Sequence, residues 1–190
     1  DFISYLQSAT SINDLTDALV EDNSLYLGND PSSTTGVAQY NLAVGIAALD
    51  DVTGGDQNTA LGYNALGSNT TGSNNVAVGI YAMMYNTTAN NNTAVGSSSL
   101  NRNTTGTFNT ATGGATLYTN TTGRYNTALG HSALRLNTTA DHNTALGVQA
   151  LEYNSTGVSN TASGNYALRD NSTGSYNTAM GYQSGDVITT

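Results

Sequence analysis

The residues of this chain that could take part in chemistry recur at one fixed spacing. Seven N-T-T or N-S-T tripeptides follow one another at intervals of 17 residues. Each is an N-x-[ST] acceptor for N-glycosylation, in which the asparagine side chain carries the sugar. An eighth tripeptide of this kind lies outside that series. The candidate glycosylation residues are Asn69, Asn86, Asn91, Asn103, Asn120, Asn137, Asn154 and Asn171.

Two interpretations of the seven evenly spaced tripeptides stay open. Glycosylation would place one glycan per repeat along a single edge of the molecule. The alternative is a tight corner, because Asn accepts left-handed backbone and Thr bonds to nearby backbone groups. Chance acceptors are common in a chain this rich in Asn and Thr. The sequence predicts a structural corner, a glycosylated edge, or both.

Tyrosines occupy positions that vary from one repeat to the next, together with Phe108, two histidines and the four arginines. A Tyr side chain combines a ring that stacks with a hydroxyl that hydrogen-bonds. We therefore expect a binding surface, with carbohydrate as the ligand. The alternative is that the rings pack on neighbouring repeats or against other chains. The residues concerned are Tyr63, Tyr81, Tyr85, Tyr118, Tyr125, Tyr153, Tyr166 and Tyr176.

Residues for metal binding or catalysis are sparse. A metal site at His131 and His142 would need further ligands that no pattern identifies. Asp50, Asp51 and Asp56 lie beside glycines but lack a repeated Asp register, which indicates a solvated corner rather than a calcium loop. No Ser-His-Asp arrangement, carboxylate pair or phosphate loop is evident. We predict that the chain is not an enzyme and uses no metal or cofactor.

The repeat must position all of these residues. The motif N-x-A-x-G occurs nine times, each 17 residues after the last, in the consensus N-T-A-[LV]-G-x-x-A-L-x-x-N-T-T-G-x-x. Positions are numbered here from its first asparagine. Equivalent asparagines stacked above one another can form ladders of side-chain amides. We predict such a ladder at position 1, through Asn41, Asn58, Asn75, Asn92, Asn109, Asn126, Asn143, Asn160 and Asn177.

The repeat length indicates the fold class. Seventeen residues are too few for helical repeats, whose units run from about 33 to 47 residues. Two short stretches, T-A-L and A-L, favour extended structure, and the Gly and Asn between them favour corners or close backbone approaches. The prediction is an all-β, parallel β-solenoid or β-roll of 17-residue rungs. With strands about 4.8 Å apart, nine rungs give a rod on the order of 43 Å long.

The rest of the chain is assigned around these rungs. Residues 41–190 form nine rungs, the last incomplete, and residues 24–40 form a degenerate capping rung. Residues 1–23 are expected to be a helical or linker cap. Within them Ser11–Val20 spaces its apolar residues at helical intervals, which predicts a short helix that covers the open end of the sheet.

Composition excludes several classes of partner. Charged residues make up only 9% of the chain, the pI is about 4.1, and nine of the 13 acidic residues lie in the first 56 positions. This charge disfavours nucleic acid. There is no Cys for disulfides and no apolar run of about 20 residues for membrane insertion. Each rung offers few large apolar residues for a core. We therefore expect a homotrimer that shares its core.

The N-T-A-L-G units resemble the head repeats of trimeric autotransporter adhesins, which form a left-handed parallel β-roll shared by three chains. The longer return segment A-L-x-x-N-T-T-G departs from that family. A second resemblance covers nearly the whole chain. The segment Ser11–Thr35, followed by N-x-A-x-G repeats, is similar to tail-fibre-type structural proteins of aquatic bacteriophages. That resemblance implies a fibre with variable residues facing a host surface, and no catalytic residues.

These observations lead to two functional expectations. The first is a fibre module on an extracellular or virion surface that adheres to a host glycan or protein through its tyrosines. The alternative is an extracellular fibril subunit that polymerises end to end and carries glycans along one edge.

Overall fold

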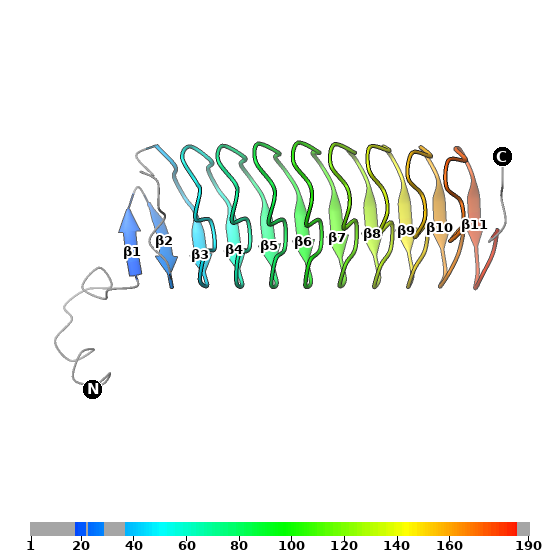
Figure 1. The fold of residues 1–190 in the computed structure, drawn as a ribbon, viewed down its shortest axis with the longest axis horizontal. Coiled ribbons are helices and arrows are strands. Elements are labelled where there is room, and N and C mark those ends of the chain that lie inside the picture. Colours follow the sequence, from blue (N-terminus) through cyan, green and yellow to red (C-terminus); the bar gives the residue numbers. More distant parts are fainter. Residues whose placement is uncertain (1–17, 22, 29–36, 186–190) are drawn as a thin grey trace, which may run out of the picture.

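The computed structural model describes residues 18–21, 23–28 and 37–185, and in them the chain winds into a straight rod (Figure 1). These residues contain strands and turns but no helix, and therefore no helix that could cross a membrane. The strands are β1 (Ala18–Glu21), β2 (Ser24–Leu27), β3 (Leu42–Val44), β4 (Thr59–Leu61), β5 (Val76–Val78), β6 (Thr93–Val95), β7 (Thr110–Thr112), β8 (Thr127–Leu129), β9 (Thr144–Leu146), β10 (Thr161–Ser163) and β11 (Thr178–Met180).

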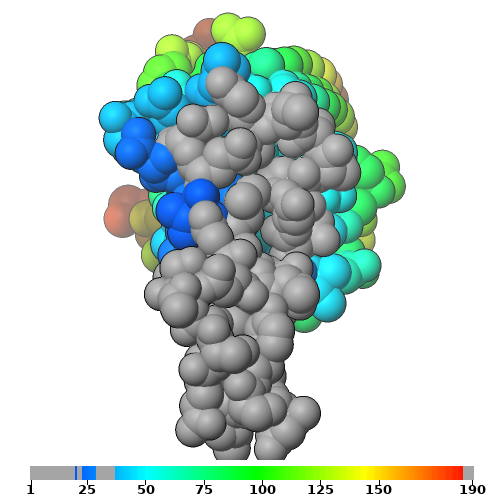
Figure 2. All heavy atoms as spheres, turned by 90° about the vertical axis from the view of Figure 1, so that its left-hand side faces the viewer, coloured from blue at the N-terminus to red at the C-terminus, as the bar shows by residue number. Residues whose placement is uncertain are grey.

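A single sheet runs the length of the rod, with its strands in sequence order. From β2 to β11 each strand pairs in parallel with the next, and the register joins residues 17 apart, such as Ala60 with Ala77. Viewed from its N-terminal end, the rod shows its later rungs behind the earlier ones (Figure 2). The predicted parallel β-solenoid of 17-residue rungs is confirmed.

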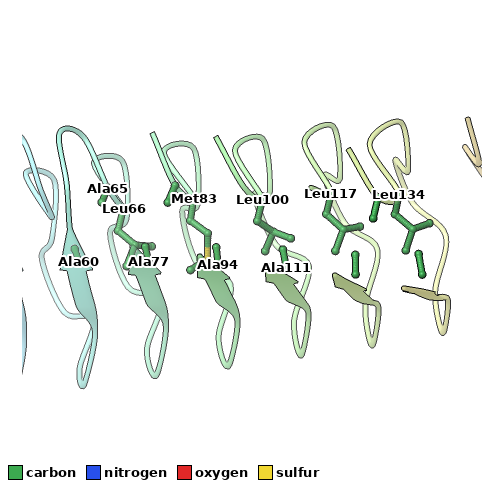
Figure 3. Close-up of a cluster of buried hydrophobic side chains, with 14 of the residues drawn as sticks. Ala60, Ala65, Leu66, Ala77, Met83, Ala94, Leu100, Ala111, Leu117 and Leu134 are labelled. Carbon is green, nitrogen blue, oxygen red and sulfur yellow. The ribbon is translucent and has the colours of Figure 1, made fainter. Parts of the chain in front are cut away.

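The core is a column of small and branched apolar side chains. In β3 to β11 the position-3 alanine points inward and is buried, while residues at positions 2 and 4 face outward. Position 9 supplies Leu66, Met83, Leu100 and their equivalents, all fully buried. These side chains reach from the return segment toward the strand alanines (Figure 3). One chain therefore closes its own core.

The prediction of a second strand in each rung, at the A-L segment, is wrong. That segment belongs to a turn, because position 9 within it, as in Leu66 (φ 52°), and position 7 just before it, as in Asn64 (φ 56°), have left-handed backbone. The turn still bonds between rungs. The N–H of Leu66 donates to the carbonyl of Ala82 in the next rung at 3.0 Å. Inter-rung bonding thus continues without a second sheet.

The position-5 glycines mark both a corner and a close backbone approach, as their recurrence predicts. Gly79 has a φ of 130°, which side-chain-bearing residues rarely adopt. A Cβ built on it would lie 2.7 Å from the carbonyl carbon and oxygen of Gly96 in the next rung. Conformation and stacking therefore both require glycine.

The N-terminal end of the sheet is covered by a strand. β1 pairs antiparallel with β2, so the prediction of a helix through residues 18–20 is wrong, because backbone pairing to the sheet edge replaces helical bonding. Residues 11–17 lie outside the described residues. Of the predicted capping rung, residues 24–40, the structure describes β2, which pairs in parallel with β3, while residues 29–36 lie outside the described residues. There Ser24 Oγ accepts the N–H of Asn41 at 2.9 Å, a bond that Asn Oδ1 accepts in later rungs.

Candidate binding surface

The position-1 asparagines form a buried ladder along the rod. From Asn41 to Asn160, each Oδ1 accepts the backbone N–H of the next position-1 asparagine, for example Asn75 N to Asn58 Oδ1 at 3.0 Å. Each Nδ2 donates to the position-15 carbonyl of its own rung, as Asn58 does to Gly72 at 2.8 Å. The amide therefore ties the strand both to the next rung and to its own corner.

The glycosylation candidates at position 12 form a second ladder. All seven are fully buried. The Nδ2 of Asn103 donates to Asn86 Oδ1 at 3.1 Å and to the Gly106 carbonyl at 2.9 Å. Gly106 also accepts from Asn92 Nδ2 at 2.9 Å. From Gly72 to Gly174 the two ladders consequently meet at each position-15 carbonyl.

This geometry bears on the two interpretations of the N-T-T tripeptides. Nδ2 is the atom to which an N-linked glycan attaches, and in these seven residues it is buried and hydrogen-bonded within the ladder. A glycan there would require the side chain to leave the core, so the structure favours the corner. Asn91, the remaining candidate, is exposed, with a φ of 59°.

Three of the predicted ligand-surface tyrosines gather around one shallow pocket. Tyr81 and Tyr85 belong to the rung that begins at Asn75, and Tyr118 lies two rungs further along. The ring of Tyr63 meets that of Tyr81 edge-on, with centroids 5.4 Å apart. The pocket has a volume of about 310 Å³ and opens widely to solvent.

Met84, Ser98, Asn101 and Arg102 complete the lining of this pocket. The guanidinium Cζ of Arg102 lies 5.7 Å from the centroid of the Tyr118 ring, a cation–π contact. Asn101 is 5% exposed, and its Nδ2 donates to the Tyr81 carbonyl at 2.9 Å. The site thus joins apolar ring surface, a cation and a fixed amide.

Tyr125 belongs to a different surface, a stack along position 17. Its ring lies parallel to Phe108 on one side and to His142 on the other, with centroids 5.1 and 5.0 Å apart. These three residues have left-handed backbone, with φ between 56° and 60°. Here rings pack on neighbouring rungs, as the alternative interpretation of the aromatic residues expects.

The remaining tyrosines lie near the C-terminal end. The ring of Tyr166 meets that of Tyr182 edge-on, with 5.8 Å between centroids, and the guanidinium of Arg169 lies over the Tyr166 ring. Tyr153 is half-exposed, and Tyr176 is 80% exposed. The structure therefore divides the predicted ligand surface into several parts, of which one is a pocket.

Charge is distributed unevenly along the rod. Between residues 57 and 140 the chain has no Asp or Glu and three arginines. Beyond this stretch Arg169 pairs with Asp170 at 3.1 Å, and Arg135, at its edge, pairs with the buried Glu152 at 3.7 Å. The pocket lies entirely within the acid-free stretch.

Candidate metal ligands do not converge. His131 and His142 lie at positions 6 and 17, with the ring of His142 against Tyr125. Asp56 Oδ1 accepts the backbone N–H of Gln39 at 2.8 Å, in a corner. Among the residues that the structure describes, no group of three His, Cys, Asp or Glu side chains is placed to hold a metal ion.

Sequence reasoning did not single out Met84, Ser98 or Asn101, although a signal was available. Met84, Asn101 and Tyr118 occupy position 10 of three consecutive rungs, so stacking alone brings them side by side.

Comparisons of this chain with family models, curated proteins and solved structures found no match.

Proposed function

We propose that this chain is a structural fibre module of an extracellular or virion surface that adheres to host-surface glycan through the pocket at Tyr81, Tyr85 and Tyr118. The observation that carries the proposal is this pocket. Ligand sites combine apolar and aromatic surface with a few placed polar groups, which is what the pocket offers. The resemblance to tail-fibre-type proteins and adhesin head repeats supports the same role.

The rod provides the rigid support that such a site needs. The residues lining the pocket stand on backbone that is bonded from rung to rung, as when Tyr81 N donates to the Tyr63 carbonyl and Tyr85 N to the Asn101 carbonyl, both at 3.0 Å. Rigid placement lowers the entropy lost on binding. Tyrosine rings on a fixed frame therefore suit a weakly polar ligand such as a sugar face.

The alternative, a glycan-coated fibril, has weaker support, because the seven evenly spaced asparagines are buried. Assembly into a trimer or an end-to-end fibril stays a prediction. A thin core favours a trimer, but the single chain already buries its leucine and methionine side chains at position 9 completely.

The proposal is tested by measuring binding of the intact chain to an array of surface polysaccharides and to a panel of bacterial cells. Tyr85→Ala should weaken binding at least about tenfold, because it removes a ring from the pocket. Tyr153→Ala is the matched control. Its ring occupies the same rung position and is 44% exposed, against 46% for Tyr85, but it lies outside the pocket.

An equal loss in the two variants would assign adhesion to tyrosines in general rather than to this pocket. Absence of binding to every polysaccharide and cell type would refute the adhesive role.

A further inference from the structure

The pocket on rungs three to five contains a cation, Arg102, that forms no ion pair with any residue that the structure describes. Among the described residues, the one side-chain interaction of Arg102 is with the ring of Tyr118. Two arginines at the neighbouring position 10 further along the rod, Arg135 and Arg169, each pair with a carboxylate. A cation–π contact orients a guanidinium without neutralising it. Arg102 is thus held in place with its hydrogen-bond donors available.

The surroundings of Arg102 strengthen its attraction for anions. No acidic residue occurs from residue 57 to residue 140. The next acidic residue along the chain, Asp141 at position 16, stands two rungs beyond the Arg102 rung, which is about 10 Å along the axis at the usual strand spacing. That separation exceeds the Debye length of about 8 Å at physiological salt. Although the chain carries a net charge of −9, its middle is locally cationic.

Asn101 provides a second polar group in the same pocket. Its side chain is 5% exposed, and its orientation is fixed by the bond from Nδ2 to the Tyr81 carbonyl. Within the described residues, Oδ1 of Asn101 accepts no hydrogen bond. Asn101 lines the pocket, and an amide oxygen can accept a hydrogen bond from a ligand hydroxyl.

The ring surfaces complete the set of groups. Tyr85 is about half-exposed and Tyr118 is partly exposed, so both present ring area to the hollow. Aromatic side chains bury apolar area while their polar tips stay hydrated. A ligand that matches the pocket therefore has an apolar face, at least one hydroxyl and one anionic group.

We propose that this pocket binds a carboxylated saccharide, one uronate-type sugar unit of an acidic polysaccharide, with its carboxylate on Arg102, a hydroxyl on Asn101 Oδ1 and its ring against Tyr85 or Tyr118. Arginine matches carboxylates because its planar fork donates two parallel hydrogen bonds. A volume of about 310 Å³ is at the lower end for ligand pockets, which suits a single sugar unit. This inference rests on the proposed adhesive function and specifies its ligand.

The test is calorimetric titration of the whole chain with trigalacturonic acid and with its fully methyl-esterified form, which keeps the rings but removes the charge. The free acid should bind at least about tenfold more tightly, because a charge-assisted bond to the guanidinium is lost on esterification. Raising the salt concentration should weaken binding of the acid, through screening, and leave the ester unaffected.

Arg102→Gln should abolish the preference for the acid, and Arg102→Lys should retain part of it, because lysine keeps the charge but not the bidentate geometry. Arg124→Gln is the matched control. It changes the net charge by the same amount within the acid-free stretch, but it lies at position 16, away from the pocket. Circular dichroism of each variant checks that the solenoid is intact.

The other outcomes separate the two proposals. Equal binding of acid and ester, unchanged in Arg102→Gln, would overturn the carboxylate assignment and leave glycan adhesion standing. Binding of a sulfated trisaccharide or of inorganic sulfate in preference to the uronate would also overturn it. If neither these sugars nor any member of the polysaccharide array binds, both proposals fail.

Discussion

Leucine at position 9 adopts a backbone conformation that leucine usually avoids. Leu66, Leu100 and Leu134 have φ values of 52°, 49° and 50°. Left-handed backbone costs an L-residue roughly 1–2 kcal/mol. Full burial of each side chain and the N–H bond to the next rung offset that strain. The position therefore selects a residue that fills the core without branching at Cβ.

The first prediction concerns this position. Leu100→Ile conserves volume, and swaps of that kind usually destabilise by less than about 1.5 kcal/mol. Here we expect a greater loss, because a β-branched side chain is strongly disfavoured at positive φ. Denaturant unfolding followed by circular dichroism measures the effect. The control is Leu129→Ile on β8, 52% exposed, which should change stability by less than about 0.5 kcal/mol. Similar losses in both variants would contradict the strain argument.

At the scale of the element, the corner and the strand are joined by shared carbonyls rather than by a second sheet. Gly72 O accepts from Asn58 Nδ2 at 2.8 Å and from Asn69 Nδ2 at 2.9 Å. Because both donors are buried, each bond is made away from competing water. The three-residue strand is consequently one part of a larger hydrogen-bonded unit that includes both amide ladders.

The second ladder gives a prediction that separates its structural role from glycosylation. Asn103→Ala in protein made without glycosylation should destabilise by about 1–3 kcal/mol, because Asn86 Oδ1 and Asn120 Nδ2 each lose a partner in the core. Thr105→Ala destroys the same acceptor tripeptide but changes only an exposed side chain. It should have an effect within about 0.5 kcal/mol in thermal unfolding. Equal effects would remove the ladder as the reason for the asparagine.

The elements that repeat exactly are the ones that the sequence predicts without ambiguity. Exact recurrence of N-x-A-x-G indicated the strands, the position-1 ladder and the stacked glycines, because identical residues in register leave one arrangement. The A-L segment was misassigned, because strand propensity does not reveal that Leu66 has left-handed backbone. The helix prediction is wrong at residues 18–20, because the spacing of apolar residues does not show that this segment pairs with β2.

The pocket was predictable only in part. Its tyrosines were recognised as variable residues, but the pattern did not separate them from the stack at Tyr125. Which rings converge depends on side chains from three rungs, and the role proposed for Arg102 depends on the lack of Asp and Glu across several rungs rather than on its own rung. At position 12 the sequence alone supports two interpretations, because N-T-T is locally consistent with both an exposed acceptor and an inward-facing amide.

On the scale of the whole molecule, the rungs are interchangeable units. Each rung contacts its neighbours through the same bonds, so stability should be close to a sum over rungs and interfaces. Deletion of residues 58–74 removes one complete rung and brings Asn41 beneath Asn75. We expect this variant to keep its sheet, with a modest fall in thermal stability measured by circular dichroism, and to keep the residues that line the pocket.

Deletion of residues 58–73, one residue fewer, is the control. It leaves an extra residue between two rungs and forces a bulge or a shift of the buried asparagines and alanines. A large loss of structure is expected. If the two deletions behaved alike, strict register would not govern the fold.

The direction of the inter-rung bonds gives this rod a definite response to tension. The strands lie across the axis of the rod, so the hydrogen bonds between them lie along it. A force that pulls the two ends apart therefore acts directly on these bonds and breaks them one rung at a time. Each released rung frees 17 residues, roughly 55 Å of extended chain. Because the rungs are nearly identical, they should unfold at similar forces. A fibre built this way would lengthen in steps and dissipate mechanical energy before it detaches from a surface.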